Sequence, residues 1–250
     1  MENIKLDSKD IRIAVIIAAF LVFLGIVSAA FISTSAWKTV RGFDNALSVT
    51  GSTKERVTSD TAKWTMEITR RTSEVGLKDG NKQMKSDIGA ATTWLMGAGI
   101  SAGDINTTPV YTQESYEYNK IQGAPREYML RSTIVVQSDD VEKITMLAKN
   151  TDTLVGQGVF VNTVSLEYYY SKLAELRVKL LGAALKDARA RATEIAGADN
   201  KRVGMLKSAS SGVVQVLPVN SGEVSDYGSF DTMNIEKEIF VTVRASFVLE

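Results

Sequence analysis

A run of twenty uncharged residues, Ile13 to Ile32, constrains this chain more than any other feature of its sequence. A helix rises 1.5 Å per residue, so this run would be about 30 Å long, which matches the hydrocarbon thickness of a bilayer. Trp37 follows the run, in the interfacial position that aromatic residues favour. The sequence therefore predicts a transmembrane anchor over residues 13–36, preceded by a short stub over residues 1–12.

A cleaved signal peptide is the competing interpretation, with Thr34 and Ala36 as small residues near a cleavage site. The apolar core of a signal peptide usually runs about 7–15 residues, which is shorter than this segment, so we favour a retained anchor. The stub is short and the part after the anchor is large. We therefore expect a single-pass protein of a bacterial inner membrane, with its C-terminal part periplasmic or extracellular.

Two pairs of small residues lie four positions apart within the predicted anchor, Ala14 with Ala18 and Gly25 with Ala29. Such pairs allow two transmembrane helices to approach closely. Ala and Gly are also common in membrane spans for no specific reason, and this simpler interpretation stays open beside the first.

The composition excludes several kinds of chemistry. The chain has no Cys and no His, which removes thiolate nucleophiles, zinc-thiolate sites and the commonest general base near neutral pH. Lys and Arg number 29, as do Asp and Glu, so no net field attracts nucleic acid. We expect no cofactor, no metal and no nucleic-acid partner.

Residues 37–46 are expected to form a linker, and residues 47–250 alternate between strand-like and helix-like patterns. Residues 61–71, for example, place Ala62, Trp64, Met66 and Ile68 on one face of a strand. The same reasoning predicts strands over residues 47–50, 105–118, 127–137, 159–170, 203–206, 213–219 and 238–249. It predicts helices from residue 77 to a stop at Gly97 and Gly99, over residues 140–150 and over residues 171–196. This order predicts an α+β fold with a mixed or antiparallel sheet and about three helices, with two interleaved subdomains as one arrangement.

Three segments of this region, taken in order, carry a family resemblance. Residues 47–52 read LSVTGS, residues 99–107 read GISAGDINT, and residues 184–192 read ALKDARARA. Together with the alternating C-terminal strand, they resemble the opening strand, the helix-to-strand junction and the long-helix signature of the SIMPL-domain family of bacterial envelope proteins. The chain departs from the family at Ser59-Asp60, where Pro-Asp is frequent, and at Glu127-Tyr128, where Gly-Tyr is frequent.

The resemblance implies an envelope location and little chemistry. Some members of the family form ring-like or channel-like homo-oligomers, and some are linked to oxidative stress. The family has no agreed catalytic residues, so none is carried over to this chain.

Two groups of residues are candidates for contact surfaces. Tyrosines cluster in the middle strands, and because a tyrosine buries its ring while its hydroxyl stays wet, they suit either an interface or ordinary sheet packing. The candidate interface residues are Tyr111, Tyr116, Tyr118 and Tyr128. A second group repeats every four residues on one stripe of the predicted long helix, and its small side chains allow close packing; it comprises Ala184, Ala188, Ala192 and Ala196.

Chemical candidates are weaker. Ser35 and Lys38 have the S-x-x-K spacing of a lysine-activated serine, but a short match of this kind is expected by chance. Glu223, Asp226 and Asp231 lie in a polar stretch from Ser221 to Met233, without the spacing of a calcium-binding loop. We interpret these carboxylates as solubilising a flexible loop.

These observations favour a non-enzymatic, membrane-anchored envelope protein whose exported domain assembles with itself into a ring-like or channel-like homo-oligomer. Its partners would be other copies of the chain and the bilayer. Two alternatives stay open: a small-molecule or partner-binding module in envelope or oxidative stress defence, and a hydrolase that uses Ser and Lys.

Overall fold

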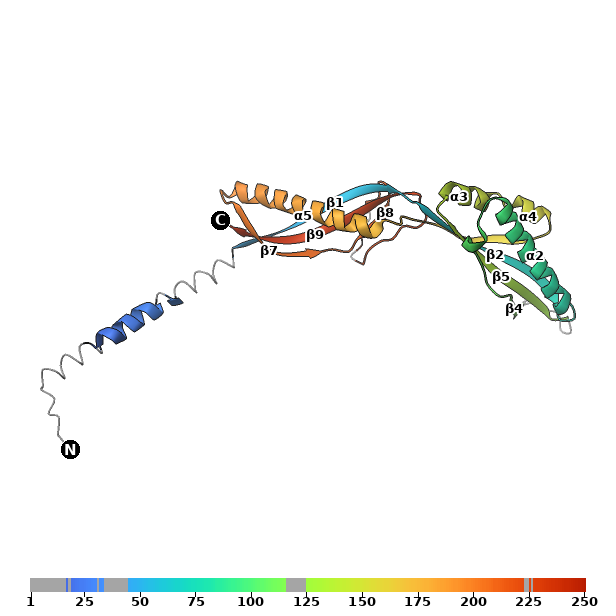
Figure 1. Cartoon of the computed structure of the whole chain (residues 1–250), viewed down its shortest axis with the longest axis horizontal. Coiled ribbons are helices and arrows are strands. Elements are labelled where there is room, and N and C mark those ends of the chain that lie inside the picture. The colour runs from blue at the N-terminus through green and yellow to red at the C-terminus, as the bar shows by residue number, and fades with distance from the viewer. Residues whose placement is uncertain are drawn as a thin grey trace, which may run out of the picture. The chain divides into compact units, whose positions relative to one another are not determined.

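The computed structural model describes residues 17, 19–30, 32–33, 45–115, 125–222, 225 and 227–250. From residue 45 onward it is an α+β fold with two antiparallel sheets, and the predicted fold class is confirmed at that level. The chain divides into two compact units, each made of non-contiguous segments (Figure 1). One unit comprises residues 1–51, 184–211 and 243–250, and the other comprises residues 52–183 and 212–242.

The longer unit contains a sheet with the strand order β3-β5-β2-β6, in which β4 also pairs with β5. Alternating residues of β2 are fully buried on one face of this sheet, as the pattern of residues 61–71 predicted. The other face of β2 stays partly exposed, which is usual for an antiparallel sheet. The strands are β2 (Thr61–Ser73), β3 (Ile105–Thr107), β4 (Tyr111–Glu114), β5 (Glu127–Ser138) and β6 (Val161–Tyr169).

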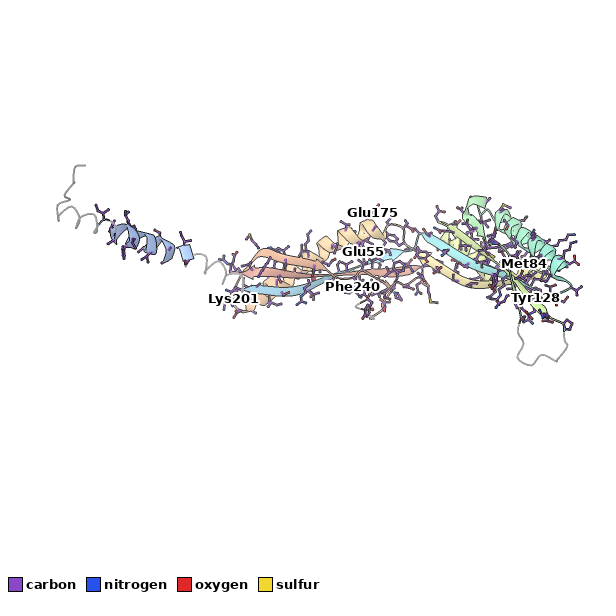
Figure 2. All side chains as sticks on the ribbon, turned by 90° about the horizontal axis from the view of Figure 1, so that it is seen from below. Glu55, Met84, Tyr128, Glu175, Lys201 and Phe240 are labelled. Carbon is purple, nitrogen blue, oxygen red and sulfur yellow. The ribbon has the colours of Figure 1, made fainter. Side chains whose placement is uncertain are left out.

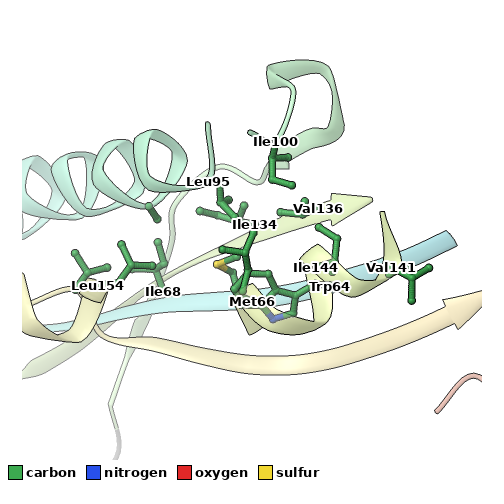
Figure 3. Close-up of a cluster of buried hydrophobic side chains, with 14 of the residues drawn as sticks. Trp64, Met66, Ile68, Leu95, Ile100, Ile134, Val136, Val141, Ile144 and Leu154 are labelled. Carbon is green, nitrogen blue, oxygen red and sulfur yellow. The ribbon is translucent and has the colours of Figure 1, made fainter. Parts of the chain in front are cut away.

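Three helices supply the apolar partners of the buried face: α2 (Leu77–Gly97), α3 (Val141–Lys149) and α4 (Asp152–Gly156). Figure 3 shows Leu95 of α2 and Ile144 of α3 in one cluster with Trp64 of the sheet. The indole N–H of Trp64 donates to Thr163 Oγ1 at 3.2 Å, so the buried ring leaves no polar atom unpaired. This cluster is the main core of the longer unit.

The second sheet has the strand order β1-β9-β7, and β8 also pairs with β9. Its strands are β1 (Ala46–Thr58), β7 (Val203–Ser211), β8 (Gln215–Pro218) and β9 (Glu236–Leu249). The long helix α5 (Leu173–Ala198) runs along β1 and β9 (Figure 1). Figure 2 shows the side chains of these strands, among them Glu55 of β1 and Phe240 of β9.

Several details differ from the sequence-based expectation. The predicted strand over residues 105–118 is interrupted, and its described part forms the short strands β3 and β4. Pro109 lies between them, and because proline has no N–H it cannot donate to a strand ladder. No helix was predicted over the residues of α4, and β7 continues to Ser211 instead of ending at Leu206. Strand β1 continues to Thr58 instead of ending at Thr50.

Candidate assembly surfaces

The alanine ladder lies on the buried stripe of α5. Ala184, Ala188, Ala192 and Ala196 are all buried, and Ala188 and Ala192 share a cluster with Phe247 of β9. Leu176 and Leu180 extend the same stripe toward the start of the helix, where they pack in a separate apolar cluster. The small residues therefore mark the part of α5 that lies closest to the sheet.

Gly51 of β1 explains why alanine is needed at this contact. A Cβ atom built on Gly51 would overlap the carbonyl oxygen of Ala184 and the backbone nitrogen of Ala188, and it would lie 2.7 Å from the Cα of Ala188. The backbones of strand and helix are thus in direct contact, with no room for a side chain between them. Two of the segments that resemble the family, residues 47–52 and 184–192, meet at this point.

The candidate tyrosines do not form one patch. Tyr111 pairs with Arg131 across the β4–β5 ladder, whereas Tyr128 pairs with Glu114. Successive residues of a strand point to opposite faces, and Arg131 and Tyr128 are three positions apart, so Tyr111 and Tyr128 lie on opposite faces of the sheet. Tyr116 and Tyr118 lie outside the described residues. An interface role for these tyrosines stays a prediction.

Strand β7 is an open sheet edge in the described part of the chain. It pairs with β9 on one side and has no strand neighbour on the other. All residues from Met205 to Ser211 are exposed, with Met205 exposed by 76%. A strand with a free edge and two uncovered faces offers unpaired backbone groups to another chain.

The edge strand β6 differs from β7 in one respect that matters for pairing. Its register with β2 shifts between Thr65 and Met66, where Val164 has no partner. Such an irregularity twists an edge and discourages the addition of another strand. In β7 the comparable irregularities are confined to residues 203–208, and the pairs from Ser208 to Ser211 follow one another regularly.

The loop between β8 and β9 is anchored by a buried lysine, which the sequence analysis did not identify. Lys237 is 1% exposed, and its ammonium group donates to the backbone carbonyl of Asp231 and lies 3.8 Å from the carboxylate of the same residue. Burial lowers the pKa of Lys237, and the charge of Asp231 opposes that shift. Lys237 precedes Ile239 by two residues and Val241 by four, so all three side chains point to the same buried face of β9. This alternation is the sequence signal that could have identified Lys237 as a buried residue.

Our interpretation of Asp231 as a solubilising residue of a flexible loop was therefore wrong. Its side chain is only 7% exposed, and it accepts hydrogen bonds from the backbone N–H of Met233 and the amide of Asn234. The side chain of Gln215 both donates to and accepts from the backbone of Ser225 in the same loop. Glu223 and Asp226 lie outside the described residues.

A second polar contact connects the β1–β2 turn to the start of α5. Asp60 accepts from the backbone N–H of Ser171 at 2.8 Å and from its hydroxyl at 2.7 Å. Burial raises the pKa of Asp60, but these hydrogen bonds outweigh it, so the net pKa lies below the ordinary value of 3.8. The contact therefore favours the ionised carboxylate.

We expect an Asp60→Asn variant to lose stability at neutral pH and to converge with the wild type in acid. Because the folded pKa is lowered, the stabilisation by Asp60 is present above pH 3.8 and is lost as the pH falls through the folded value. Thermal midpoints of both proteins between neutral and strongly acidic pH will test this. A difference that stays constant across the whole range would contradict the assignment.

The longer unit also has two concavities on its surface. A concavity of about 460 Å³ is lined by Thr69, Arg70, Arg71, Met129 and Phe160. Another of about 480 Å³ is lined by polar residues, namely Thr61, Gly103, Asp104, Asn106, Gln137, Ser138 and Asp139. No group of three or more Asp, Glu, His or Cys side chains is arranged to hold a metal within the described ranges.

The predicted anchor is only partly described. Residues 19–30 are helical, and Gly25 and Ala29 belong to this helix, whereas Ala14 and Ala18 lie outside the described residues. Ser35 and Lys38, the S-x-x-K pair, also lie outside them. Within the described part of the chain, no helix combines the length and hydropathy that a membrane span requires.

The fold and these contacts define an α+β protein in which two antiparallel sheets pack against helices and β7 forms an open sheet edge. Its buried Lys237 has a structural role, because it binds the backbone carbonyl of Asp231 in the loop between β8 and β9. The chain belongs to the SIMPL family, described as a protein of unknown function (DUF541), whose model matches residues 47–247. The resemblance found in the sequence is thereby confirmed. No curated protein matches the chain.

Proposed function

We propose that this chain is a non-enzymatic, membrane-anchored envelope protein whose SIMPL domain assembles into a closed homo-oligomer. The single observation that carries this proposal is the edge of β7, where seven consecutive exposed residues have no partner strand on one side among the described residues. Natural proteins usually protect such an edge with charge, proline or a covering element, because it recruits other chains. The regular part of β7, from Ser208 to Ser211, carries neither a charge nor a proline, as expected of an edge that serves in assembly.

The apolar N-terminal segment supports the membrane part of the proposal. The helical residues from Phe20 to Leu24 are all large, apolar and exposed, which water disfavours and lipid favours. The hydroxyl of Ser28 donates to the carbonyl of Leu24 at 2.8 Å, so this polar group is satisfied within the helix itself. A tethered domain also gains from assembly, since confinement raises its effective concentration.

Light scattering on residues 45–250 at micromolar concentration tests the assembly part. We expect a mass of several subunits, in a closed and symmetric form because most homo-oligomers are closed. A monomer mass that persists when the full chain is measured in mild detergent would reject assembly. Fractionation of cells tests the anchor, and recovery of the protein in the soluble fraction, with a mature start near Trp37, would reject it.

A binding module is the second candidate, and the concavity of about 460 Å³ supports it. That volume lies in the range of small-molecule sites, and Met129 and Phe160 provide apolar lining beside Arg70 and Arg71. The Arg70 guanidinium is already bound to the carboxylate of Asp87 at 2.7 Å and to Gln83 at 3.2 Å. A ligand would therefore compete with existing contacts, which makes this candidate secondary.

The hydrolase alternative has less support. Burial lowers the pKa of Lys237, and the carboxylate of Asp231 lies beside its ammonium group. The two residues therefore resemble an acid–base pair. The cavity that both residues line offers only about 10 Å³, which is about the least space that can admit one water molecule. A substrate has no room there, and the pair is better explained as an anchor for the loop.

A further inference from the structure

We propose that two copies of the chain associate through β7, which pairs with β7 of the second copy in an antiparallel ladder centred on Ser210. This inference rests on the proposed assembly and names the strand, the partner and the register through which it occurs. The interface would be isologous, with the same residues contributed by both copies about a two-fold axis.

The direction of the backbone groups sets the register. The N–H of Gly212 donates to the carbonyl of Thr242 at 2.9 Å, just beyond the end of β7. In an antiparallel ladder, alternate residues of a strand bond to the same neighbour, so Ser210 and Ser208 bond toward β9. The backbone groups of Ala209 and Ser211 then point away from β9, toward the open side.

A second β7 offers a matching set of groups. When the ladder is centred on Ser210, Ala209 of one copy lies opposite Ser211 of the other, and these two residues exchange both backbone hydrogen bonds. The two Ser210 residues then face each other as a pair without backbone hydrogen bonds, with their Cα atoms about 4.5 Å apart. The register uses all the outward-pointing groups of the regular part of the strand.

Charge and size favour this partner over an unrelated strand. Residues 208–212 read SASSG, without a charge or a bulky side chain, so two copies approach without repulsion or steric conflict. Lys207 is the single charged residue of β7, and the register places it opposite Val213, so the two lysines stay apart. A strand that carries large or charged residues would leave these small exposed side chains without contacts.

The pairing ends where β7 becomes irregular. The register of β7 with β9 shifts between Val203 and Leu206 and again between Leu206 and Ser208. The carbonyl of Gly204 also accepts a hydrogen bond from Arg189 of α5 at 3.1 Å. We therefore confine the ladder to the regular segment from Ser208 to Gly212.

Disulfide trapping tests the register, because the chain has no cysteine and a single introduced thiol is unique. The full chain carrying Ser210→Cys, in mild detergent, is oxidised and examined on a non-reducing gel. Facing Cα atoms at about 4.5 Å are within the range of a disulfide, so most of the protein should become a covalent dimer. Two controls should stay uncoupled: Ser208→Cys, whose two copies would be roughly 13 Å apart, and Asn162→Cys on the β6 edge.

The mass of each reduced variant separates the two proposals. One outcome is that the variants are oligomeric when reduced and yet, after oxidation, Ser210→Cys forms no more covalent dimer than Asn162→Cys. That result overturns the β7 ladder but leaves the proposed assembly standing. Equal yields of disulfide-linked dimer from Ser208→Cys and Ser210→Cys overturn the register, because random collisions would produce such equal yields. A monomer mass for the wild-type chain overturns both proposals together.

Discussion

Replacing Gly51 with alanine is expected to lower the free energy of unfolding by about 3 kcal/mol or more. The added methyl group would overlap backbone atoms of Ala184 and Ala188, and a helix backbone cannot rotate away as a flexible side chain can. Overpacking of a core commonly costs about 1–3 kcal/mol, and contact with backbone lies at the upper end of that range or beyond. Urea denaturation followed by circular dichroism measures this loss.

Gly182→Ala is the matched control for Gly51→Ala. Gly182 is an exposed residue of α5, and a Cβ atom there meets nothing within 4 Å. Alanine stabilises a helix interior relative to glycine, so we expect a gain of about 0.5–1 kcal/mol. If Gly51→Ala were as stable as the wild type, the strand and the helix could not be in direct backbone contact, and the explanation of the alanine ladder would fail.

The second large effect concerns Lys237, whose replacement by alanine should cost about 3–5 kcal/mol. The change removes the hydrogen bond to the Asp231 carbonyl and leaves the carboxylate of Asp231 buried without its cation. Breaking one side of a buried ion pair costs far more than losing an exposed pair, because the remaining charge stays desolvated. Thermal and urea denaturation should show the loss together with faster proteolysis of the loop between β8 and β9.

Two variants serve as controls for Lys237→Ala. Lys179 lies 2.9 Å from Glu55 in an exposed pair, with exposed fractions of 69% and 36%, so Lys179→Ala should cost about 0–1 kcal/mol. The double variant Lys237→Met with Asp231→Asn removes both charges and places an apolar side chain of similar size at residue 237. It should therefore recover much of the stability that Lys237→Ala loses. Equal losses for Lys179→Ala and Lys237→Ala would contradict the assignment of Lys237 as a buried anchor.

The sequence predicted the elements that bury one face. The alternation of residues 61–71 appears as β2, and the helix predicted from Leu77 ends at Gly97, one of the two glycines that were expected to stop it. Asp140, part of the predicted helix start, accepts a hydrogen bond from the backbone N–H of Lys143 at 3.0 Å at the start of α3. These elements follow local rules, in which apolar spacing selects the period and a carboxylate satisfies a free N–H at a helix start.

The second half of β7 could not be predicted in the same way. Residues 207–211 read KSASS and have no apolar alternation, because neither face of the strand is covered. Only the backbone ladder with β9 makes this segment a strand, and a ladder with a distant residue leaves no local signal. The proposed assembly edge is therefore a feature that became visible only with the structure.

The buried lysine was missed for a different reason. The last strand was predicted to begin at Glu238, one residue after Lys237, because a charged residue rarely occupies a core position. The strand begins at Glu236, and its inward phase includes Lys237. The partner atoms come from Asp231, six residues earlier in a loop whose path the sequence pattern does not determine.

Native mass spectrometry of the full chain, extracted in mild detergent, tests the central claim most directly. The claim is that the SIMPL domain of this protein assembles with itself at the membrane. It predicts a single dominant species that contains several copies of the 27.2 kDa chain and that persists on dilution. A dominant species of one chain under the same conditions would contradict the claim and would favour the binding module instead.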